Sequence, residues 1–113
     1  MNRRHRLRHN LDIRTVWRHG KRLRHPVGML VLRKNNLDHS RFCFSANKRV
    51  GNAVHRNRSK RLMREVVRLH IGEINPGWDC VFVANRTTVE SHFTTVEAGI
   101  LRLLARAKII VSS

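Results

Sequence analysis

Acidic residues are scarce in this sequence, in which seven Asp and Glu residues stand against 24 Lys and Arg residues and leave a formal net charge of +17. With so few carboxylates, the chain offers no pair suited to holding a catalytic metal ion. It also lacks a nucleophile with a histidine and an orienting acid, and it has no P-loop. We therefore expect neither catalytic nor metal-binding residues in the protein itself.

Cysteine is almost as rare, and neither Cys43 nor Cys80 has the spacing of a metal site. Both lie in apolar runs, which favours buried, reduced thiols in a cytoplasmic protein. The eight histidines are scattered, which is more typical of solvated or RNA-facing side chains than of ligands. The basic start of the chain precedes no apolar signal segment, and no run approaches membrane-spanning length. We expect a cytoplasmic protein with neither a membrane nor a small molecule as its partner.

The positive charge is concentrated in one part of the chain. Residues 1–68 contain 20 of the basic residues and only three acids, whereas residues 69–113 contain four of each. Nineteen of the 24 cations are arginine, whose guanidinium group pairs well with phosphate oxygens. Because such a charge excess opposes folding through self-repulsion, we expect a large anionic partner.

The hydrophobic pattern predicts a flexible basic arm over residues 1–9 and one α+β domain over residues 10–113. The first helix starts near Asn10, with Asn10 or Asp12 as its cap, and ends at Gly20. A second helix covers residues 53–70, and a third follows a capping box at Thr94. The predicted strands cover residues 26–33, with a proline first, 41–48, with alternating apolar residues, and 80–84.

The helix predicted over residues 53–70 has the sequence AVHRNRSKRLMREVVRLH, with six cations and one acid, Glu65. On a helical projection the cations occupy roughly half of the circumference. Leu62, Val66 and Leu69 lie on the side that we expect to face the sheet, and Val67 is an apolar residue among the cations. A solvated charged face would mix charges of both signs, so this one-sided pattern favours binding to a polyphosphate.

RNA suits this helix better than DNA does. A helix that enters the major groove of DNA usually belongs to an all-helical domain or a zinc module, whereas this one lies between strands. With only two Trp and four Phe residues, broad base stacking is not expected, and shape and phosphate contacts should dominate.

Residues 48–65, KRVGNAVHRNRSKRLMRE, resemble the RNR motif of the bacterial ribonuclease P protein family. The likeness extends along most of the chain, because residues 10–20 resemble the family's first helix, 41–48 its central strand and 77–84 its late strand. Three residues depart from the family pattern: Ile13 replaces a usual Phe, Cys43 a usual Gly, and Asn85 a common basic residue.

The resemblance implies a fold like domain 2 of ribosomal protein S5, with a mostly antiparallel sheet and a left-handed β-α-β crossover. It implies that the partner is the catalytic RNA of ribonuclease P, which uses Mg²⁺ in its own active site, while the protein binds no cofactor. The holoenzyme removes the 5′ leader of precursor tRNA. The alternatives are a ribosomal or other structural RNA-binding protein and a DNA-binding regulator, neither of which accounts for the RNR stretch.

The resemblance also assigns residues to two sites. The RNA-binding residues would be Arg56, Asn57, Arg58, Lys60, Arg61, Arg64 and Arg68 of the helix, with Lys48 and Arg49 before it. The cleft for the single-stranded leader would be lined by Ile13, Val16, Trp17, Val31, Ser45 and Val83, with Arg49 at its sheet side. For the apolar residues of the first helix, ordinary core packing is the alternative.

Overall fold

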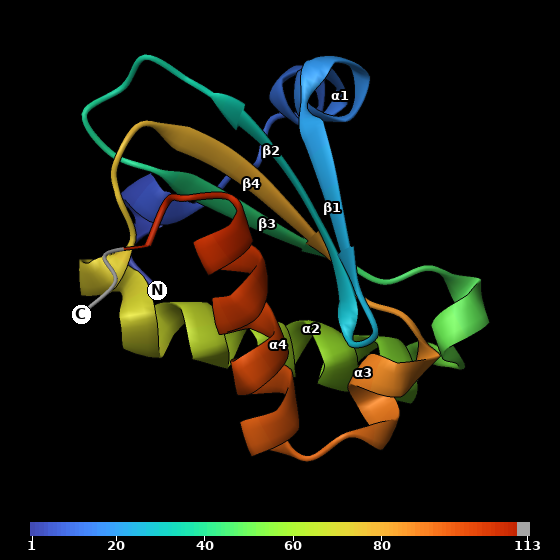
Figure 1. The fold of residues 1–113 in the computed structure, drawn as a ribbon. Helices are drawn as coiled ribbons and strands as arrows, with labels where there is room; N and C mark the ends of the chain where they lie inside the picture. The colour runs from blue at the N-terminus through green and yellow to red at the C-terminus, as the bar shows by residue number, and fades with distance from the viewer. Residues whose placement is uncertain (111–113) are drawn as a thin grey trace.

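Four strands form a sheet with helices packed on both of its faces in the computed structural model, which describes residues 1–110 (Figure 1). In chain order the elements are α1 (Asn10–His19), β1 (Lys21–His25), β2 (Gly28–Lys34), β3 (Arg41–Ser45), α2 (Ala53–His70), β4 (Trp78–Val83), α3 (Arg86–Glu90) and α4 (Phe93–Arg106). Short 3-10 turns occur at Arg3–His5, Lys48–Val50 and Ile71–Glu73. The predicted α+β class is confirmed.

The strands lie in the order β1-β2-β4-β3. β2 pairs antiparallel with both β1 and β4, while β3 pairs parallel with β4, so the sheet is mostly antiparallel, as predicted. Two parallel neighbours need a crossover connection, and α2 provides it between β3 and β4. The strongly basic helix is therefore held inside a β-α-β unit.

The sheet separates two hydrophobic clusters. The larger one lies between the sheet and the helices α2 and α4, and Leu30, Phe42 and Phe82 point into it. The smaller one lies on the opposite face, where Val16 of α1 packs against Val31 and the other buried residues of that face. Phe42 and Phe44 face α2 while Cys43 faces α1, so the alternation predicted for this strand is confirmed.

The first hairpin differs from the prediction, because the strand expected to start at Pro26 begins at Gly28. Pro26 lies in the turn, and the preceding residues, KRLRH, form the separate strand β1. Only Leu23 of this strand is buried. A charged edge strand with one inward residue gives almost no hydrophobic period, which explains why the sequence did not reveal it.

The predicted helix caps were only partly right. Gly20 ends α1 as predicted, and a Cβ there would lie 2.4 Å from the Val16 carbonyl oxygen. The prediction of Asn10 or Asp12 as its N-cap was wrong, because His9 occupies that position. The capping box at Thr94 is also wrong: α4 starts at Phe93, after His92. A capping box does form earlier in the chain, where Asn85 and Thr88 begin the unpredicted helix α3.

The buried stripe of α2 is rotated relative to the prediction. Ser59, Met63, Val66 and Val67 are its buried residues, whereas Leu69 is 52% exposed. Val67, which we expected among the cations, is fully buried. The stripe is centred between Met63 and Val66, and Leu69 lies about 100° from that centre on an ideal helix.

Residues 1–9 lie along the outer edge of β3 rather than extending as the free arm that the sequence suggested. The Leu7 amide donates to the Phe42 carbonyl oxygen at 2.9 Å, and Arg6 forms a parallel bridge with Phe42. Leu7 is buried in the α1-side cluster, and Met1 packs against the larger core. One leucine among four arginines gave no periodicity from which this packing could be predicted.

None of the helices within residues 1–110 has both the length and the apolar character needed to cross a membrane.

Candidate RNA-binding surfaces

Two consecutive caps determine how α2 leaves the sheet. Asn47 accepts a hydrogen bond from the Arg49 amide, which starts the 3-10 turn of Lys48–Val50. Asn52 then accepts from the His55 amide at 3.0 Å and starts α2. Between them Gly51 has a φ of 143°, a region that L-residues rarely adopt. These caps place the exposed side chains of the 3-10 turn beside the first turn of the basic helix.

The outward face of α2 carries the predicted cations. Arg58, Arg61 and Arg64 are exposed, as is Asn57. Arg56 and Lys60 lie beside the buried stripe and are half-buried. Arg56 also donates from Nη1 to the Gly51 carbonyl oxygen at 2.9 Å, so this side chain supports the loop before the helix. We use the name α2 basic face for the exposed residues Asn57, Arg58, Arg61 and Arg64, together with Lys48 and Arg49.

Besides Arg56, two further members of the predicted RNA-binding set already have partners inside the protein. Arg68 donates to both oxygens of Glu65, including a 2.9 Å bond from Nε, and this hydrogen bonding lowers the pKa of Glu65. The guanidinium carbon of Arg64 lies 5.5 Å from the centroid of the Phe44 ring. The structure thus places Arg68 in an ion pair, whereas Arg58 and Arg61 have no carboxylate partner among residues 1–110.

A second surface lies beneath α1, on the sheet face that this short helix covers only in part. The strand register aligns Arg22, Val31, Val81 and Cys43 in one row and Arg24, Met29, Val83 and Ser45 in the next. The first row holds the fully buried Val31 and Val81, while Met29, Val83 and Ser45 of the second row are half-buried. We call the second row, with the adjoining side chains of α1, the α1 cleft.

The predicted cleft residues divide into two groups. Ile13 and Trp17 are half-buried at the side of α1 next to the sheet and can contact a ligand. Val16 is 1% exposed and Val31 is fully buried, so these residues hold α1 on the sheet and cannot touch a bound RNA. For Val16 the structure thus supports core packing, the alternative stated for the first helix, and Val31 of β2 is likewise a core residue.

Sequence reasoning missed several residues of this surface. Arg22 and Arg24 flank the buried Leu23, so alternation alone would have placed both on the α1 side once β1 was recognised. Met29 was also overlooked in the strand that carries Val31. Arg49, which was expected at the sheet side, lies exposed in the turn after β3.

A buried ion pair fixes α1 over the sheet. Arg41 of β3 donates from Nε to Asp79 of β4 at 2.8 Å and from Nη2 at 2.6 Å. Its Nη1 reaches Asp12 of α1 at 3.4 Å, and Asn35 donates to Asp79 at 2.9 Å. The pKa of Arg41 is raised, chiefly by the hydrogen bond to Asp79. The arginine therefore joins the edge strand β3, its neighbour β4 and the helix α1 above them.

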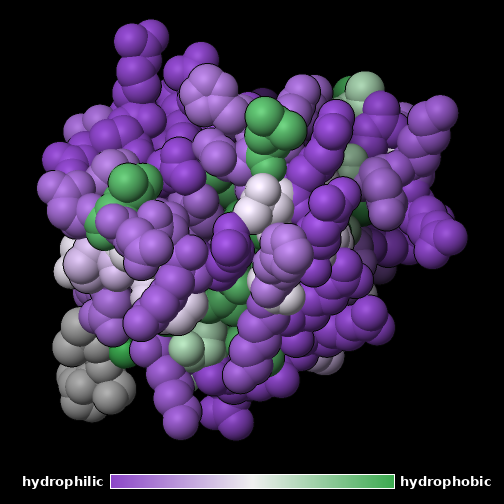
Figure 2. All heavy atoms as spheres, turned by 90° about the horizontal axis from the view of Figure 1, so that it is seen from above, coloured by the Kyte–Doolittle hydropathy of each residue, from purple (hydrophilic) through white to green (hydrophobic). Residues whose placement is uncertain are grey.

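The surface seen from the α1 end of the sheet is mostly hydrophilic (Figure 2). Hydrophobic side chains appear there only as small patches between polar ones. Within residues 1–110, no three His, Cys, Asp or Glu side chains gather in a group that could hold a metal ion. Both cysteines are free thiols, with Cys80 buried, as predicted, and Cys43 half-buried. The arrangement can bind polyanions, and its described residues provide no site for coordinating a cation.

Comparisons with known proteins agree on one family. Residues 1–108 match the family model described as Ribonuclease P. The chain is 36% identical over 104 residues to the "Ribonuclease P protein component" of Alkaliphilus metalliredigens, covering 92% of this chain and 94% of that protein. It is 37% identical over 106 residues to the protein of the same name from Clostridioides difficile, covering 93% of each.

Solved structures give the same result for the fold. The RNase P protein of Staphylococcus aureus superposes with a TM-score of 0.85 at 25% identity, covering 95% of this chain and 98% of that one. The RNase P protein of Thermotoga maritima superposes with a TM-score of 0.81 at 31% identity, covering 96% and 98%.

Proposed function

The chain belongs to the ribonuclease P protein family, and on that premise we propose that its two surfaces hold different RNAs during tRNA 5′ maturation. The α2 basic face binds the catalytic RNA of ribonuclease P. The α1 cleft binds the single-stranded 5′ leader of precursor tRNA. The protein works in the cytoplasm, a compartment in which its free thiols stay reduced.

The family gives the general role without further assumption. The chain is the RNA-binding protein component of ribonuclease P, an endoribonuclease of tRNA processing. The RNA subunit carries the chemistry in this family, and the protein accordingly acts through binding. A ribosomal role is not favoured by any of these similarities.

One observation supports the assignment of α2 to the catalytic RNA. Arg58, Arg61 and Arg64 project from the outward side of the single helix α2, with Glu65 as the only acid in that helix. Guanidinium groups without internal partners lose no ion pair when they bind phosphate. A helix packed in a β-α-β unit also presents them in fixed positions, which favours recognition of a folded RNA by its shape and backbone.

The leader assignment rests on the residues of the α1 cleft. Trp17 offers an aromatic ring on which a base can stack, and Met29 and Val83 give the sheet side an apolar surface. Arg22 and Arg24 border this surface and supply positive charge for the backbone of the strand. Single-stranded RNA is commonly bound by this combination of an aromatic platform and flanking cations.

Electrostatics connects the two surfaces to catalysis. The catalytic RNA and precursor tRNA are both polyanions, so their approach is opposed by repulsion between phosphates. A protein of net charge +17 placed between them reduces that repulsion. The Mg²⁺ used in the reaction is held by the RNA, because the described residues of the protein do not fit a Mg²⁺ site. We expect the protein to lower the Mg²⁺ concentration that cleavage requires.

Reconstitution tests this function directly. The protein is added to ribonuclease P RNA at low Mg²⁺ and cleavage of precursor tRNA is followed. We expect clear stimulation that weakens with added salt, by roughly tenfold for a few-fold rise in salt if several phosphates are neutralised. Absence of stimulation at every Mg²⁺ concentration would instead support a structural RNA-binding role.

A further inference from the structure

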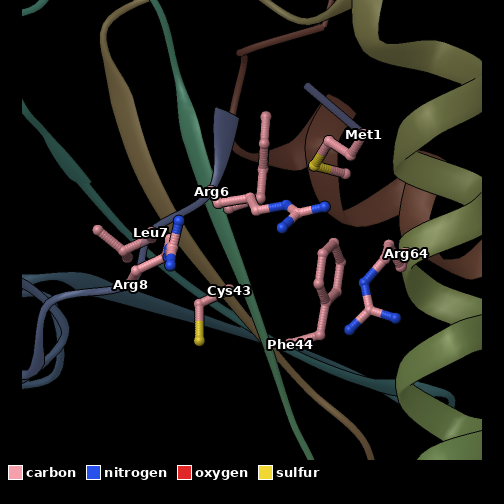
Figure 3. A pocket seen from close by; sticks show the side chains of 8 residues that line it. Met1, Arg6, Leu7, Arg8, Cys43, Phe44 and Arg64 are labelled. Atoms are coloured by element: carbon pink, nitrogen blue, oxygen red, sulfur yellow. The ribbon is translucent and has the colours of Figure 1, made fainter. Parts of the chain in front are cut away.

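A pocket with a volume of about 430 Å³ opens at the outer edge of β3, between the N-terminal segment and α2 (Figure 3). We call it the β3-edge pocket. It lies outside the α1 cleft and shares only Arg64 with the α2 basic face. Its lining residues are Met1, Arg6, Leu7, Arg8, Phe42, Cys43, Phe44 and Arg64.

The lining of this pocket is strongly cationic. It includes three arginines, Arg6, Arg8 and Arg64, and no acidic residue. None of the three pairs with a carboxylate within residues 1–110. Figure 3 shows the guanidinium groups of Arg6 and Arg64 extending into the space around the Phe44 ring, while Cys43 points to the other side of β3. Arg6 and Arg64 thus converge on one space, and Arg8 lines the Cys43 side of the same pocket. Guanidinium groups without a carboxylate partner in such an arrangement favour a bound anion.

The backbone adds hydrogen-bonding groups to the same place. The Phe42 carbonyl oxygen faces away from β4, because it accepts the hydrogen bond from Leu7. Residues two apart in a strand direct their peptide groups to the same edge, so the N–H and C=O of Phe44 also face the pocket. A backbone N–H beside guanidinium groups is a combination that proteins use to bind phosphate.

The position of the pocket indicates which phosphate it would bind. Leu7 and Cys43 belong to the cluster on the α1 side of the sheet, whereas Met1 and Phe44 pack against the core on the α2 side. The pocket therefore connects the two faces around the edge of β3. Ser45 and Cys43 are also the β3 members of the two rows beneath α1. A single-stranded RNA that runs along the α1 cleft toward β3 would reach the pocket next.

We propose that the β3-edge pocket binds a phosphate of the precursor-tRNA leader, upstream of the nucleotides in the α1 cleft. This proposal rests on the proposed function, because it assumes that the leader occupies the cleft. Arg6 holds the phosphate from the N-terminal segment and Arg64 holds it from α2, while Arg8 supplies positive charge on the side of the pocket next to Cys43. The volume is sufficient for the attached nucleoside, which lies against Met1 and Phe44.

The test uses holoenzymes reconstituted with wild-type protein or with the double variant Arg6→Gln/Arg8→Gln. Affinity is measured for precursor tRNAs with leaders of increasing length and for mature tRNA. The matched control is Arg3→Gln/Arg102→Gln, which removes the same charge from exposed residues outside the pocket. Circular dichroism and the affinity of each variant for ribonuclease P RNA are measured alongside, so that a folding or assembly defect is recognised.

We expect the double variant to lose roughly five- to tenfold in affinity for long leaders and nothing for short leaders or mature tRNA. The slope of log affinity against log salt should fall by about 0.7 for each phosphate that the variant no longer neutralises. The control should follow the wild type at every length. Two results would overturn the proposal: an unchanged length dependence in the variant, or an equal loss for all substrates, which would place the phosphate in the catalytic RNA.

The same experiment separates this proposal from the proposed function. If the wild-type holoenzyme shows no gain in affinity with leader length, the leader cleft itself is wrong. If the wild type shows the gain and Arg6→Gln/Arg8→Gln retains it in full, only the β3-edge pocket is wrong.

Discussion

Arg22 lies over the indole ring of Trp17, with its guanidinium carbon 5.2 Å from the ring centroid. The same side chain donates from Nη2 to the Trp17 carbonyl oxygen at 3.1 Å. The last turn of α1 and the edge strand β1 are thereby held together at the border of the α1 cleft. Because the indole is already kept in one orientation, stacking of a base on it costs the protein little conformational entropy.

This geometry predicts a substrate-specific effect of Trp17→Ala. Stacking of a base on an aromatic side chain contributes about 1–3 kcal/mol, so precursor tRNA should bind roughly tenfold more weakly to the variant holoenzyme. Mature tRNA has no leader and should bind as before. Leu11→Ala is the control, because Leu11 is on the same helix and 74% exposed. An equal loss for precursor and mature tRNA would remove the leader role of the indole.

The α2 basic face predicts a different response. Replacing both Arg58 and Arg61 with glutamine should weaken binding to ribonuclease P RNA. The magnitude of the slope of log affinity against log salt concentration should fall by about 0.7–0.9 for each phosphate left without a cation. Once the variant is saturated with RNA, discrimination between precursor and mature tRNA should be unchanged. The control is the pair Arg86→Gln and Arg102→Gln, exposed cations of α3 and α4. If both pairs change the slope equally, only net charge matters and the helix has no special role.

Much of the fold was predictable because several elements carry their own local signals. The apolar period of α2 lies within the helix sequence, and the alternation around Phe42 reflects two faces of one strand. Gly20 marks the end of α1 because the Val16 carbonyl leaves no room for a side chain there. Each of these signals arises from residues close together in the chain.

The missed features depend on residues far apart in the chain. β1 has one inward residue, Leu23, and forms because β2 supplies its partner. Residues 1–9 were expected to be free, but the Leu7 amide donates to the Phe42 carbonyl oxygen and the Leu7 side chain is buried in the α1-side cluster, contacts that sequence periodicity does not encode. Within α2 itself, the orientation of the buried stripe depends on how the helix docks on the sheet. Leu69 was therefore misplaced even though the helix was correct.

The ion pair under α1 predicts a stability effect that is separate from RNA binding. Asp79→Asn removes the charge that Arg41 contacts through two hydrogen bonds. Breaking a buried pair costs about 3–5 kcal/mol, but the Arg41 side chain is 20% exposed and keeps Asp12 as a partner, so we expect about 2 kcal/mol. Urea unfolding measures this difference. Asp38→Asn, at an 86% exposed carboxylate, should leave the free energy of unfolding close to that of the wild type, and similar effects of the two substitutions would contradict this account.

His70 predicts how stability changes with pH. Its Nε2 lies 2.9 Å from Glu97 of α4 and its Nδ1 contacts Glu73, and both hydrogen bonds raise its pKa. A neutral imidazole can donate from only one nitrogen, so the two carboxylates together favour the imidazolium. Because the folded pKa lies above the unfolded value of about 6.5, the stabilisation is complete below about pH 6 and is lost as pH rises through the folded pKa.

The measurement is the free energy of unfolding of wild-type protein and His70→Gln from about pH 5.5 to 9. The difference between the two should be largest at the acidic end and should shrink with rising pH. A difference that is constant across the range, or that grows toward high pH, would show that the charge of His70 is not responsible.

Cys43 offers a chemical probe at the place where the α1 cleft meets the β3-edge pocket. Burial raises the pKa of its thiol, and Lys60 and Arg64 offset this only in part, so alkylation should be slow at neutral pH and faster as pH rises. Cys80 is completely buried, and its raised pKa leaves no accessible thiolate in the folded protein. Mass spectrometry of the native protein should therefore find the label on Cys43 alone.

In the holoenzyme, precursor tRNA with a long leader should protect Cys43, while mature tRNA should not. Equal protection by both RNAs would mean that the leader does not pass this edge of the sheet.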